Sequence, residues 1–294
     1  MSNKNLISSE NIDSARRLLL NVDRLPTIST TFEKLIQLMD DDNSSVHELE
    51  KIIQLDMVVS TRILKLVNSP FYGYSGITSI SHSITLLGFN TLRNLALSAL
   101  LSNVFNAEQS IGEVSAADFW LHSIGVAYIS KLLALRTDRG EPEEMFTLGL
   151  LHDIGKLMYF KETPEFFSAI IERTQETKKS LNHVETEIGI SHAYLGWFLC
   201  EKWNFPSKIT SVIKDHHHLS DDNRFPYEVA IVNLADYIVH RLEIGKSGNA
   251  YPDTPSSAVS LRLKLSKQAW SKIRDNLSDQ KEAIVKVSQQ LLKT

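Results

Sequence analysis

The helical spacing of apolar residues is the feature that most restricts how this chain can fold. Apolar side chains recur three and four positions apart, as at Phe32, Leu35, Ile36 and Met39, whereas few stretches alternate with the two-residue period of a strand. Only 12 glycines and 8 prolines occur in 294 residues, so residues that break helices are scarce. The sequence therefore predicts an all-α protein.

Residues that favour helix ends divide the apolar pattern into separate helices. Ser44 and Ser45 precede Glu48 as in a capping box, and Asp56 is suited to cap the next helix. Further helices are predicted for residues 84–87, 92–104, 117–135, 142–160, 164–177, 183–204, 207–216, 228–244 and 266–292. Residues 245–255 are rich in Gly, Ser, Asn and Pro, so we expect an exposed, flexible loop there.

Charge and composition exclude several classes of function. With 31 basic and 35 acidic side chains the net charge is −4, which gives no electrostatic reason to expect a nucleic-acid partner. The single cysteine, Cys200, excludes an internal disulfide and zinc sites built from several thiolates, and its neighbours predict a buried position. Residues 1–17 lack the apolar block of a signal peptide, and no run approaches the roughly 18 apolar residues of a membrane span. We expect a soluble, cytoplasmic protein.

The histidines are unevenly distributed along the chain. Of ten histidines only His47 and His82 precede residue 110, and a weak boundary falls near residues 106–112. We therefore expect one subdomain over residues 1–110 and a second over residues 111–294, with any chemistry in the second.

The segment around His152 and Asp153 is the sharpest local feature. This adjacent pair lies in a mostly apolar helical stretch, where an unpartnered charge is costly to bury. Either a bound metal ion or a structural ion pair would resolve that cost. Lys156 follows one turn later and is suited either to contact a phosphate or to form a salt bridge.

Further candidate ligands lie in helical contexts, and each has a plainer alternative. His122 lies on an apolar helix and could be a core histidine, and Asp236 could hydrogen-bond within its own helix. His192 precedes a helix and could bond only to backbone atoms. His216, His217 and His218 end a short helix, where imidazolium groups would also complement the helix dipole. His216 is preferred over His218 because of its spacing from Pro206.

The order of these residues resembles a known superfamily. His122, His152-Asp153 and Asp236 resemble the ligand quartet of the HD-domain metal-dependent phosphohydrolases. Other motifs, over about residues 20 to 240, resemble the HDOD (HD-related output domain) family: Leu25-Pro26, Asn68-Ser69, Tyr72-Gly73, Leu87-Gly88, Gly189-Ile190-Ser191-His192, Trp203-Asn204-Phe205-Pro206 and His216-His217.

The resemblance implies an N-terminal helical subdomain packed on an HD-type helical bundle. Members of the family are usually signalling or output modules, and many have lost the metal ligands, whereas the set is complete here. Similarity to the HD-GYP phosphodiesterases places His192, His216 and His217 at a second metal, with Asp153 bridging both ions. The Gly-Tyr-Pro element of those enzymes is missing after the paired histidines, so hydrolysis of cyclic di-GMP is not expected.

The leading hypothesis is a signal-transduction protein with a metal-dependent phosphohydrolase site that acts on a phosphoester or nucleotide. One or two divalent ions would be bound, with iron or manganese favoured over zinc or magnesium. Asp153 and Lys156 would be catalytic, and Glu187 would orient a ligand imidazole. The alternatives are a non-catalytic module that binds a signalling protein, with a vestigial or structural metal site, and a sensor that binds a nucleotide without cleaving it.

Overall fold

The computed structural model describes most of the chain. It places residues 7–21, 23, 26, 28–38, 44–69, 72–104, 110–265, 281, 282 and 284–289. Within these residues the protein is all-α, as predicted. The only strands among them are β1 (Ser110–Ile111) and β2 (Val114–Ser115), which form one short antiparallel pair.

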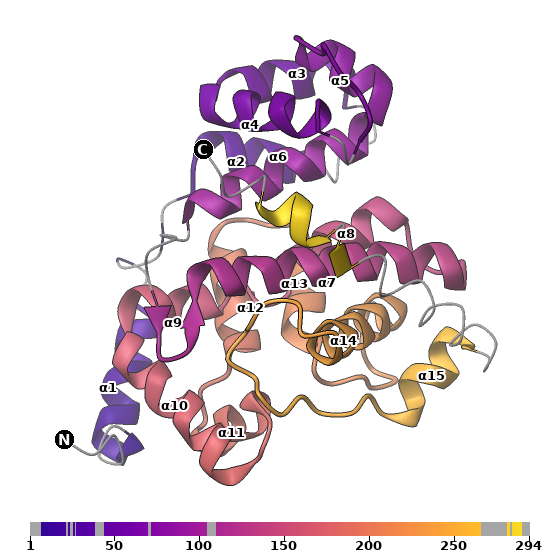
Figure 1. Ribbon diagram of the computed structural model, residues 1–294. Helices are drawn as coiled ribbons and strands as arrows, with labels where there is room; N and C mark the ends of the chain where they lie inside the picture. The colour runs from indigo at the N-terminus through magenta and orange to yellow at the C-terminus, as the bar shows by residue number, and fades with distance from the viewer. Residues whose placement is uncertain are drawn as a thin grey trace.

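The N-terminal half forms a separate layer of helices (Figure 1). The layer comprises α2 (Thr30–Gln37), α3 (Val46–Gln54), α4 (Met57–Val67), α5 (Ile80–Leu87) and α6 (Phe89–Val104). The predicted caps at Ser45 and Asp56 are confirmed, because the side chain of Ser45 accepts a hydrogen bond from the Glu48 amide, and Asp56 accepts from Val58 and Val59. The bond from the Ser45 amide to the Glu48 side chain that would complete a capping box stays a prediction. α6 packs against α2, α3, α4 and α5 and also against α8, so it joins this layer to the rest of the molecule.

The chain from α7 onward forms a larger helical bundle (Figure 1). It comprises α7 (Ala116–Thr137), α8 (Pro142–Leu151), α9 (Lys156–Glu162), α10 (Pro164–Thr177), α11 (Leu181–Ile188), α12 (His192–Lys202), α13 (Ser207–Asp215), α14 (Pro226–Arg241) and α15 (Ser257–Leu263). The first helix, α1 (Ser9–Leu19), packs on α9 of this bundle, and Arg16 donates a hydrogen bond to the Gly189 carbonyl. The division at residue 110 stays a prediction.

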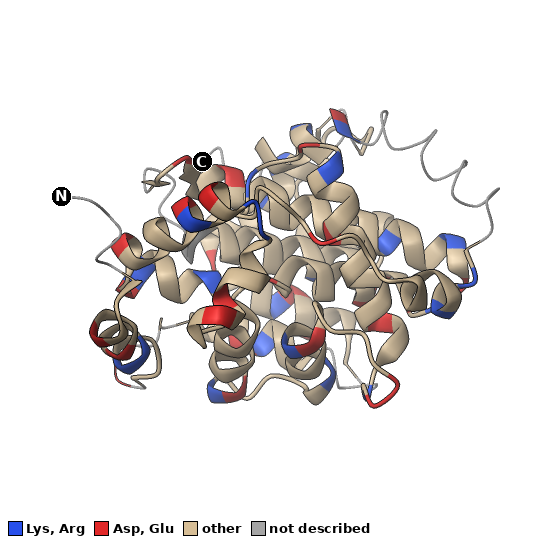
Figure 2. Ribbon diagram, turned by 90° about the horizontal axis from the view of Figure 1, so that it is seen from below, with Lys and Arg blue, Asp and Glu red and all other residues tan. Residues whose placement is uncertain are grey.

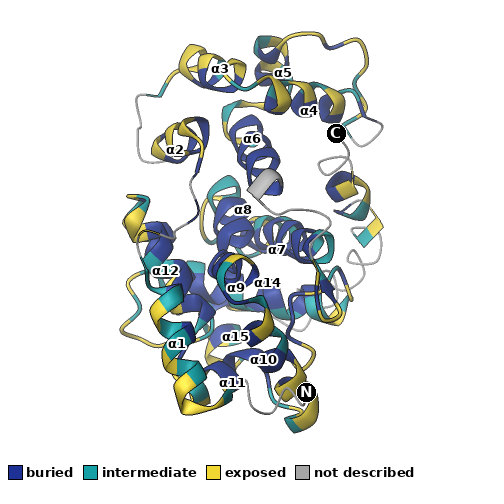
Figure 3. Cartoon of the chain, turned by 90° about the vertical axis from the view of Figure 1, so that its left-hand side faces the viewer, coloured by how far each residue is buried: buried dark blue, intermediate teal, exposed yellow. Residues whose placement is uncertain are grey.

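The long helix α7 lies at the centre of the bundle. It packs against α8 and α14, and Figure 3 shows these three helices to be largely buried. Phe119 and Trp120 near its start are buried, as are Leu133 and Ala134 near its end. A helix that is apolar on nearly all sides can only be stable inside the protein. Polar residues on α7, such as His122, are therefore held in a water-poor interior.

A polar network connects the N-terminal layer to the bundle. The Asn94 amide on α6 donates to the backbone carbonyl and to the carboxylate of Glu143 on α8, at 2.8 and 2.9 Å. Thr91 donates to the same carboxylate, and the Thr147 hydroxyl on α8 donates to Asn94 Oδ1 at 2.6 Å. Since these side chains satisfy one another, α6 and α8 are held in a fixed register.

Two of the predicted helices are broken in the structure. The helix predicted for 142–160 divides into α8 and α9 at a turn through residues 152–155, and the one predicted for 183–204 divides at Gly189, whose φ is +71°. At the first break Gly155 lies against α12, where a Cβ atom would approach the His192 carbonyl oxygen to 2.0 Å. Both errors have one cause: the apolar spacing continues across each turn.

The predicted exposed loop at 245–255 is partly wrong. Ser247 and Asn249 are buried, and the Asn249 side chain accepts a hydrogen bond from the Leu181 amide. Asp253 accepts one from Ser180. α15 was not predicted, whereas the buried position of Cys200 is confirmed. Most of the helix predicted for 266–292, as well as Met39 and Leu25, lies outside the described residues.

Two surface properties bear on function. Acidic and basic residues are interspersed over the helices in the view of Figure 2, without a face of one sign. None of the helices that the structure describes combines the length and apolar character that a membrane crossing requires.

We predict that Gly155→Ala lowers the free energy of unfolding by more than about 3 kcal/mol, because the added methyl group meets backbone atoms of α12 that cannot move aside. Gly125→Ala is the matched control, since a Cβ there meets only side-chain atoms of Val239 and Ile244, at 3.1 Å, and should cost about 1 kcal/mol. Urea denaturation measures both. Equal losses would show that the contact between the turn and α12 is not close.

Candidate metal centre

The seven residues predicted as metal ligands meet in one cluster inside the bundle. His122 comes from α7, and Asp236 from α14. His152 and Asp153 follow the end of α8, His192 begins α12, and His216 with His217 follow the end of α13. Five separate segments of the chain therefore supply the cluster, whose members are buried except for the half-buried His217.

One group of these residues surrounds the Oδ2 side of Asp153. His152 Nε2 lies 3.3 Å and His122 Nε2 3.9 Å from Asp153 Oδ2. Asp236 Oδ1 lies 3.1 Å from His122 Nε2 and 3.8 Å from His152 Nε2. Donor atoms that share one ion at about 2.0–2.2 Å lie roughly 3 to 4 Å apart. We name this group the first position.

A second group surrounds the other oxygen of Asp153. His192 Nε2 lies 3.1 Å and His216 Nε2 3.8 Å from Asp153 Oδ1. His217 Nε2 lies 2.9 Å from His192 Nε2. We name this group the second position. The two oxygens of one carboxylate thus face two different sets of imidazoles.

Hydrogen bonds at the Nδ1 atoms of His152 and His216 orient both rings so that their Nε2 atoms face the cluster. The Gly149 carbonyl lies 2.8 Å from His152 Nδ1, and the Ile213 carbonyl lies 2.7 Å from His216 Nδ1. A carbonyl only accepts, so Nδ1 carries the proton in both rings. In the neutral form of each ring Nε2 is then the atom with a free lone pair, and it faces Asp153 as a metal ligand would face an ion.

The carboxylate that orients His192 is Glu185 rather than Glu187. Glu185 is fully buried, and its Oε2 accepts hydrogen bonds from His192 Nδ1 and, at 3.2 Å, from the His192 amide. Glu187 instead pairs with Lys179 and His183 at the surface. Residues two apart on a helix face different sides, so only one of the two glutamates of α11 can point inward. The expectation for Glu187 is wrong.

The electrostatics favour ionised carboxylates, whereas the imidazoles differ from one another. Burial opposes protonation of His152 and His192, but Asp153 raises the pKa of His152, and Glu185 raises the pKa of His192 to about 9. Burial acts to raise the pKa of Asp153, but His152 and Lys156 hold it well below its ordinary value. Burial likewise opposes ionisation of Asp236, and its histidine neighbours keep its pKa well below the ordinary value. Burial lowers the pKa of His122 to about 4 and, together with nearby histidines, the pKa of His216 to about 3. Anionic oxygens and neutral imidazole nitrogens are the donors of divalent metal sites.

Several buried atoms of the cluster are without a hydrogen bond of good geometry. They are the Nε2 atoms of His122, His152 and His216, and the Oδ1 atoms of Asp153 and Asp236. Leaving so many buried polar atoms unsatisfied is costly. A cation at each position would satisfy them, so the residues fit divalent ions by the chemistry of their donors.

Lys156 forms an ion pair with the central carboxylate. Its Nζ donates to Asp153 Oδ2 at 2.6 Å, and both side chains are buried. Of the two roles that the sequence left open, the structure shows the salt bridge. The ammonium group therefore lies on the Oδ2 side of Asp153, next to the first position.

Sequence reasoning missed one histidine of the cluster. His240 lies one turn after Asp236 on α14, and its Nε2 is 3.3 Å from Asp236 Oδ1. The spacing of four residues on one helix was the available signal. His218, the third member of the histidine run, is exposed and belongs to neither position.

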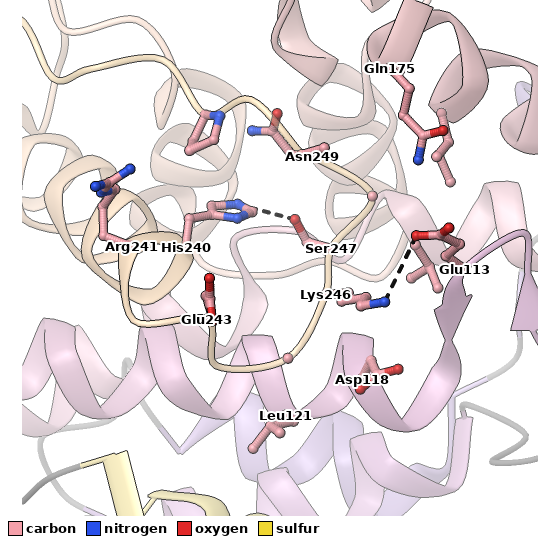
Figure 4. A pocket seen from close by; sticks show the side chains of 16 residues that line it. Glu113, Asp118, Leu121, Gln175, His240, Arg241, Glu243, Lys246, Ser247 and Asn249 are labelled. Atoms are coloured by element: carbon pink, nitrogen blue, oxygen red, sulfur yellow. Dashed lines mark hydrogen bonds and ion pairs between the residues drawn. The ribbon is translucent and has the colours of Figure 1, made fainter. Parts of the chain in front are cut away.

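The cluster borders a cleft through His240. The cleft has a volume of about 660 Å³ and is lined by α7, α10, α14 and the segment that follows α14 (Figure 4). That volume is within the usual range for small-molecule sites, about 300–1,000 Å³. Polar side chains line it, including Gln175, Arg241, Lys246 and Asn249.

The fold and the cluster define an all-helical protein with a buried histidine–aspartate centre suited to divalent cations. Residues 25–219 match the HDOD domain family. Since this match covers most of the chain, the protein belongs to that family.

Solved structures and one curated protein are similar to this chain. An HDOD domain protein of unknown function from Geobacter sulfurreducens is 25% identical, with a TM-score of 0.75 over 95% of this chain and 96% of that one. A "Putative phosphohydrolase" from Shewanella amazonensis SB2B is 23% identical, with a TM-score of 0.72 over 93% and 97% of the two chains. A "Putative signal transduction protein" from Marinobacter aquaeolei VT8 is 18% identical, with a TM-score of 0.80 over all of this chain and 69% of that one.

An uncharacterized protein of Treponema pallidum is 23% identical over 216 residues, which make up 72% of this chain and 41% of that protein. The chain therefore spans less than half the length of this curated relative.

We predict that Glu185→Gln weakens binding of Mn²⁺ about 10- to 100-fold, because His192 loses the anionic acceptor that orients its ring. Glu187→Gln is the matched control on the same helix and should leave binding unchanged, since its contacts are at the surface. Isothermal titration of metal-stripped protein measures both. Unchanged affinity in the Glu185 variant would show that the ring is oriented by other contacts.

Proposed function

We propose that this HDOD protein binds two divalent cations in the cluster and hydrolyses a phosphoester, with nucleotides as the substrate class to test first. The observation that carries the proposal is the position of the Asp153 carboxylate between two sets of histidines. Its Oδ2 faces His122 and His152, while its Oδ1 faces His192 and His216. A carboxylate placed in this way can bridge two ions. Iron and manganese suit the mixture of imidazole and carboxylate donors.

Bound cations would lower the pKa of a water molecule and offset the charge of a phosphate group. The residues of the chain provide the setting for this chemistry. Asp153 links the two positions, and carbonyl groups fix the rings of His152 and His216. Burial keeps bulk water away from most of the donors, so electrostatic interactions at the cluster are stronger than at the surface.

Lys156 is proposed to stabilise negative charge on the phosphate. Its buried ammonium group already lies 2.6 Å from Asp153 Oδ2, so no movement of the backbone is needed to bring positive charge to the centre. A preorganised cation costs little reorganisation when charge develops during the reaction. The cleft beside His240 provides space for the rest of a nucleotide-sized substrate.

A non-catalytic signalling module is the second candidate function. The observation that favours it is a group of exposed apolar residues where α3 ends and α4 begins, namely Leu55, Met57 and Val58. Neighbouring exposed apolar side chains of this kind are typical of protein-binding surfaces. In this alternative the cluster holds a structural metal, and a signalling protein is the partner.

Turnover separates the two candidates. We predict that the wild-type protein loaded with Mn²⁺ or Fe²⁺ hydrolyses generic phosphodiester or nucleotide substrates, and that Asp153→Asn lowers the rate more than about 100-fold because both positions lose their shared ligand. His218→Ala removes an exposed histidine next to the cluster and should retain full activity. Activity that survives in the Asp153 variant would indicate a contaminating enzyme. Metal-loaded wild-type protein without turnover would favour the signalling module.

A further inference from the structure

We propose that His240 is a fifth protein donor to the first position, in addition to His122, His152, Asp153 and Asp236. The inference rests on the proposed function, since it concerns a ligand of the same centre. It adds to that centre a residue that belongs to none of the motifs on which the family resemblance depends.

The surroundings of Asp236 Oδ1 are the first argument. Three imidazole nitrogens approach this one oxygen, from His122 at 3.1 Å, His240 at 3.3 Å and His152 at 3.8 Å. The oxygen is buried and has no hydrogen bond of good geometry. Three nitrogens that gather around one anionic oxygen without hydrogen-bonding it form an arrangement that a shared cation would satisfy.

The packing of α7 against α14 is the second argument. Asp236 and His240 are one turn apart, so their side chains share the face of α14 that meets α7. Gly125, close to one turn after His122, allows α7 and α14 to approach each other closely. A Cβ atom at this position would lie only 3.1 Å from Val239 of α14. The rings of His122 and His240 consequently lie 4.7 Å apart between centroids, and His122, Asp236 and His240 each offer an atom within 4.8 Å of the others.

Ser247 presents the competing role for His240. Its hydroxyl lies 3.2 Å from His240 Nε2, at the wall of the cleft (Figure 4). A neutral imidazole nitrogen has one lone pair, so Nε2 can either accept a hydrogen bond from Ser247 or bind a cation. If the role of His240 were only to hold the segment around Ser247, removing either side chain would change metal binding to the same extent.

The donor count has a chemical consequence. Three imidazoles and two carboxylate oxygens leave one free place in an octahedral shell, whereas zinc in proteins is most often bound by four ligands. The first position should therefore prefer ions that accept six ligands, such as Mn²⁺, Fe²⁺ or Co²⁺. His240 is the donor of this set that lines the cleft, the side from which a substrate can approach.

The test uses the full-length chain, stripped with a chelator and titrated with Co²⁺ and Mn²⁺. Metal content by elemental analysis, affinity by calorimetry and the visible spectrum of bound Co²⁺, which reports the number and kind of ligands, are the readouts. His240→Ala should weaken one of the two sites more than about 100-fold and change the Co²⁺ spectrum. His240→Gln keeps the side-chain volume and serves if the alanine variant does not fold by circular dichroism.

Two controls separate ligation from packing. His183→Ala removes an exposed histidine of α11, and Ser247→Ala removes the competing hydrogen-bond partner; both should bind metal as the wild type does. If the His240 variants keep the wild-type metal affinity and Co²⁺ spectrum, the inference about His240 is wrong, but the proposed function is not affected. The same conclusion follows if Ser247→Ala loses as much metal affinity as the His240 variants. A wild-type chain that takes up no cation would overturn the proposed function as well.

Discussion

The buried carboxylate of Asp153 is the constraint on which the organisation of the bundle depends. An ionised group in a protein interior must be matched by opposite charge or by donors, because its desolvation is costly. Here Lys156 supplies one positive charge, and His152 of the same turn converges on the two oxygens together with histidines from three further segments. The turn between α8 and α9 brings Asp153 to α12, and Gly155 permits the contact because it has no side chain. The fold therefore compensates the buried charge with residues that could also hold a cation.

Hydrogen bonds around the cluster orient three of its histidine rings. Carbonyl oxygens of Gly149 and Ile213 hold two rings, and the Glu185 carboxylate holds a third. The two carbonyl contacts come from the last turns of α8 and α13, next to the histidines that they orient, whereas Glu185 reaches His192 from α11. Local backbone structure thus orients the rings of His152 and His216, and a neighbouring helix orients the ring of His192.

The sequence predicted the helical class, because the apolar spacing and the caps at Ser45 and Asp56 are local properties. It also identified His122, His152, Asp153, His192, His216, His217 and Asp236, which the structure brings together. Their convergence could be expected only from the family resemblance, since residues so far apart in the chain carry no mutual signal. Glu185 was missed for that reason, since it contributes through a contact between two helices and belongs to no quoted motif. His240 belongs to no quoted motif either, although its spacing of four residues from Asp236 was a local signal. The segment near Ser247 was misjudged because its composition indicates turns but not what the turns pack against.

The polar network of Asn94, Glu143 and Thr147 places the N-terminal layer in direct contact with the helix that leads into His152 and Asp153. A change in the packing of α6 on α8 would move the starting point of that turn. Thermodynamic linkage then makes the relation mutual: a protein that bound the outer helices and favoured one packing would alter the cation affinity by the factor by which the cations alter its own. In such a molecule, cation binding at the cluster and protein binding at the outer helices would shift the same conformational equilibrium.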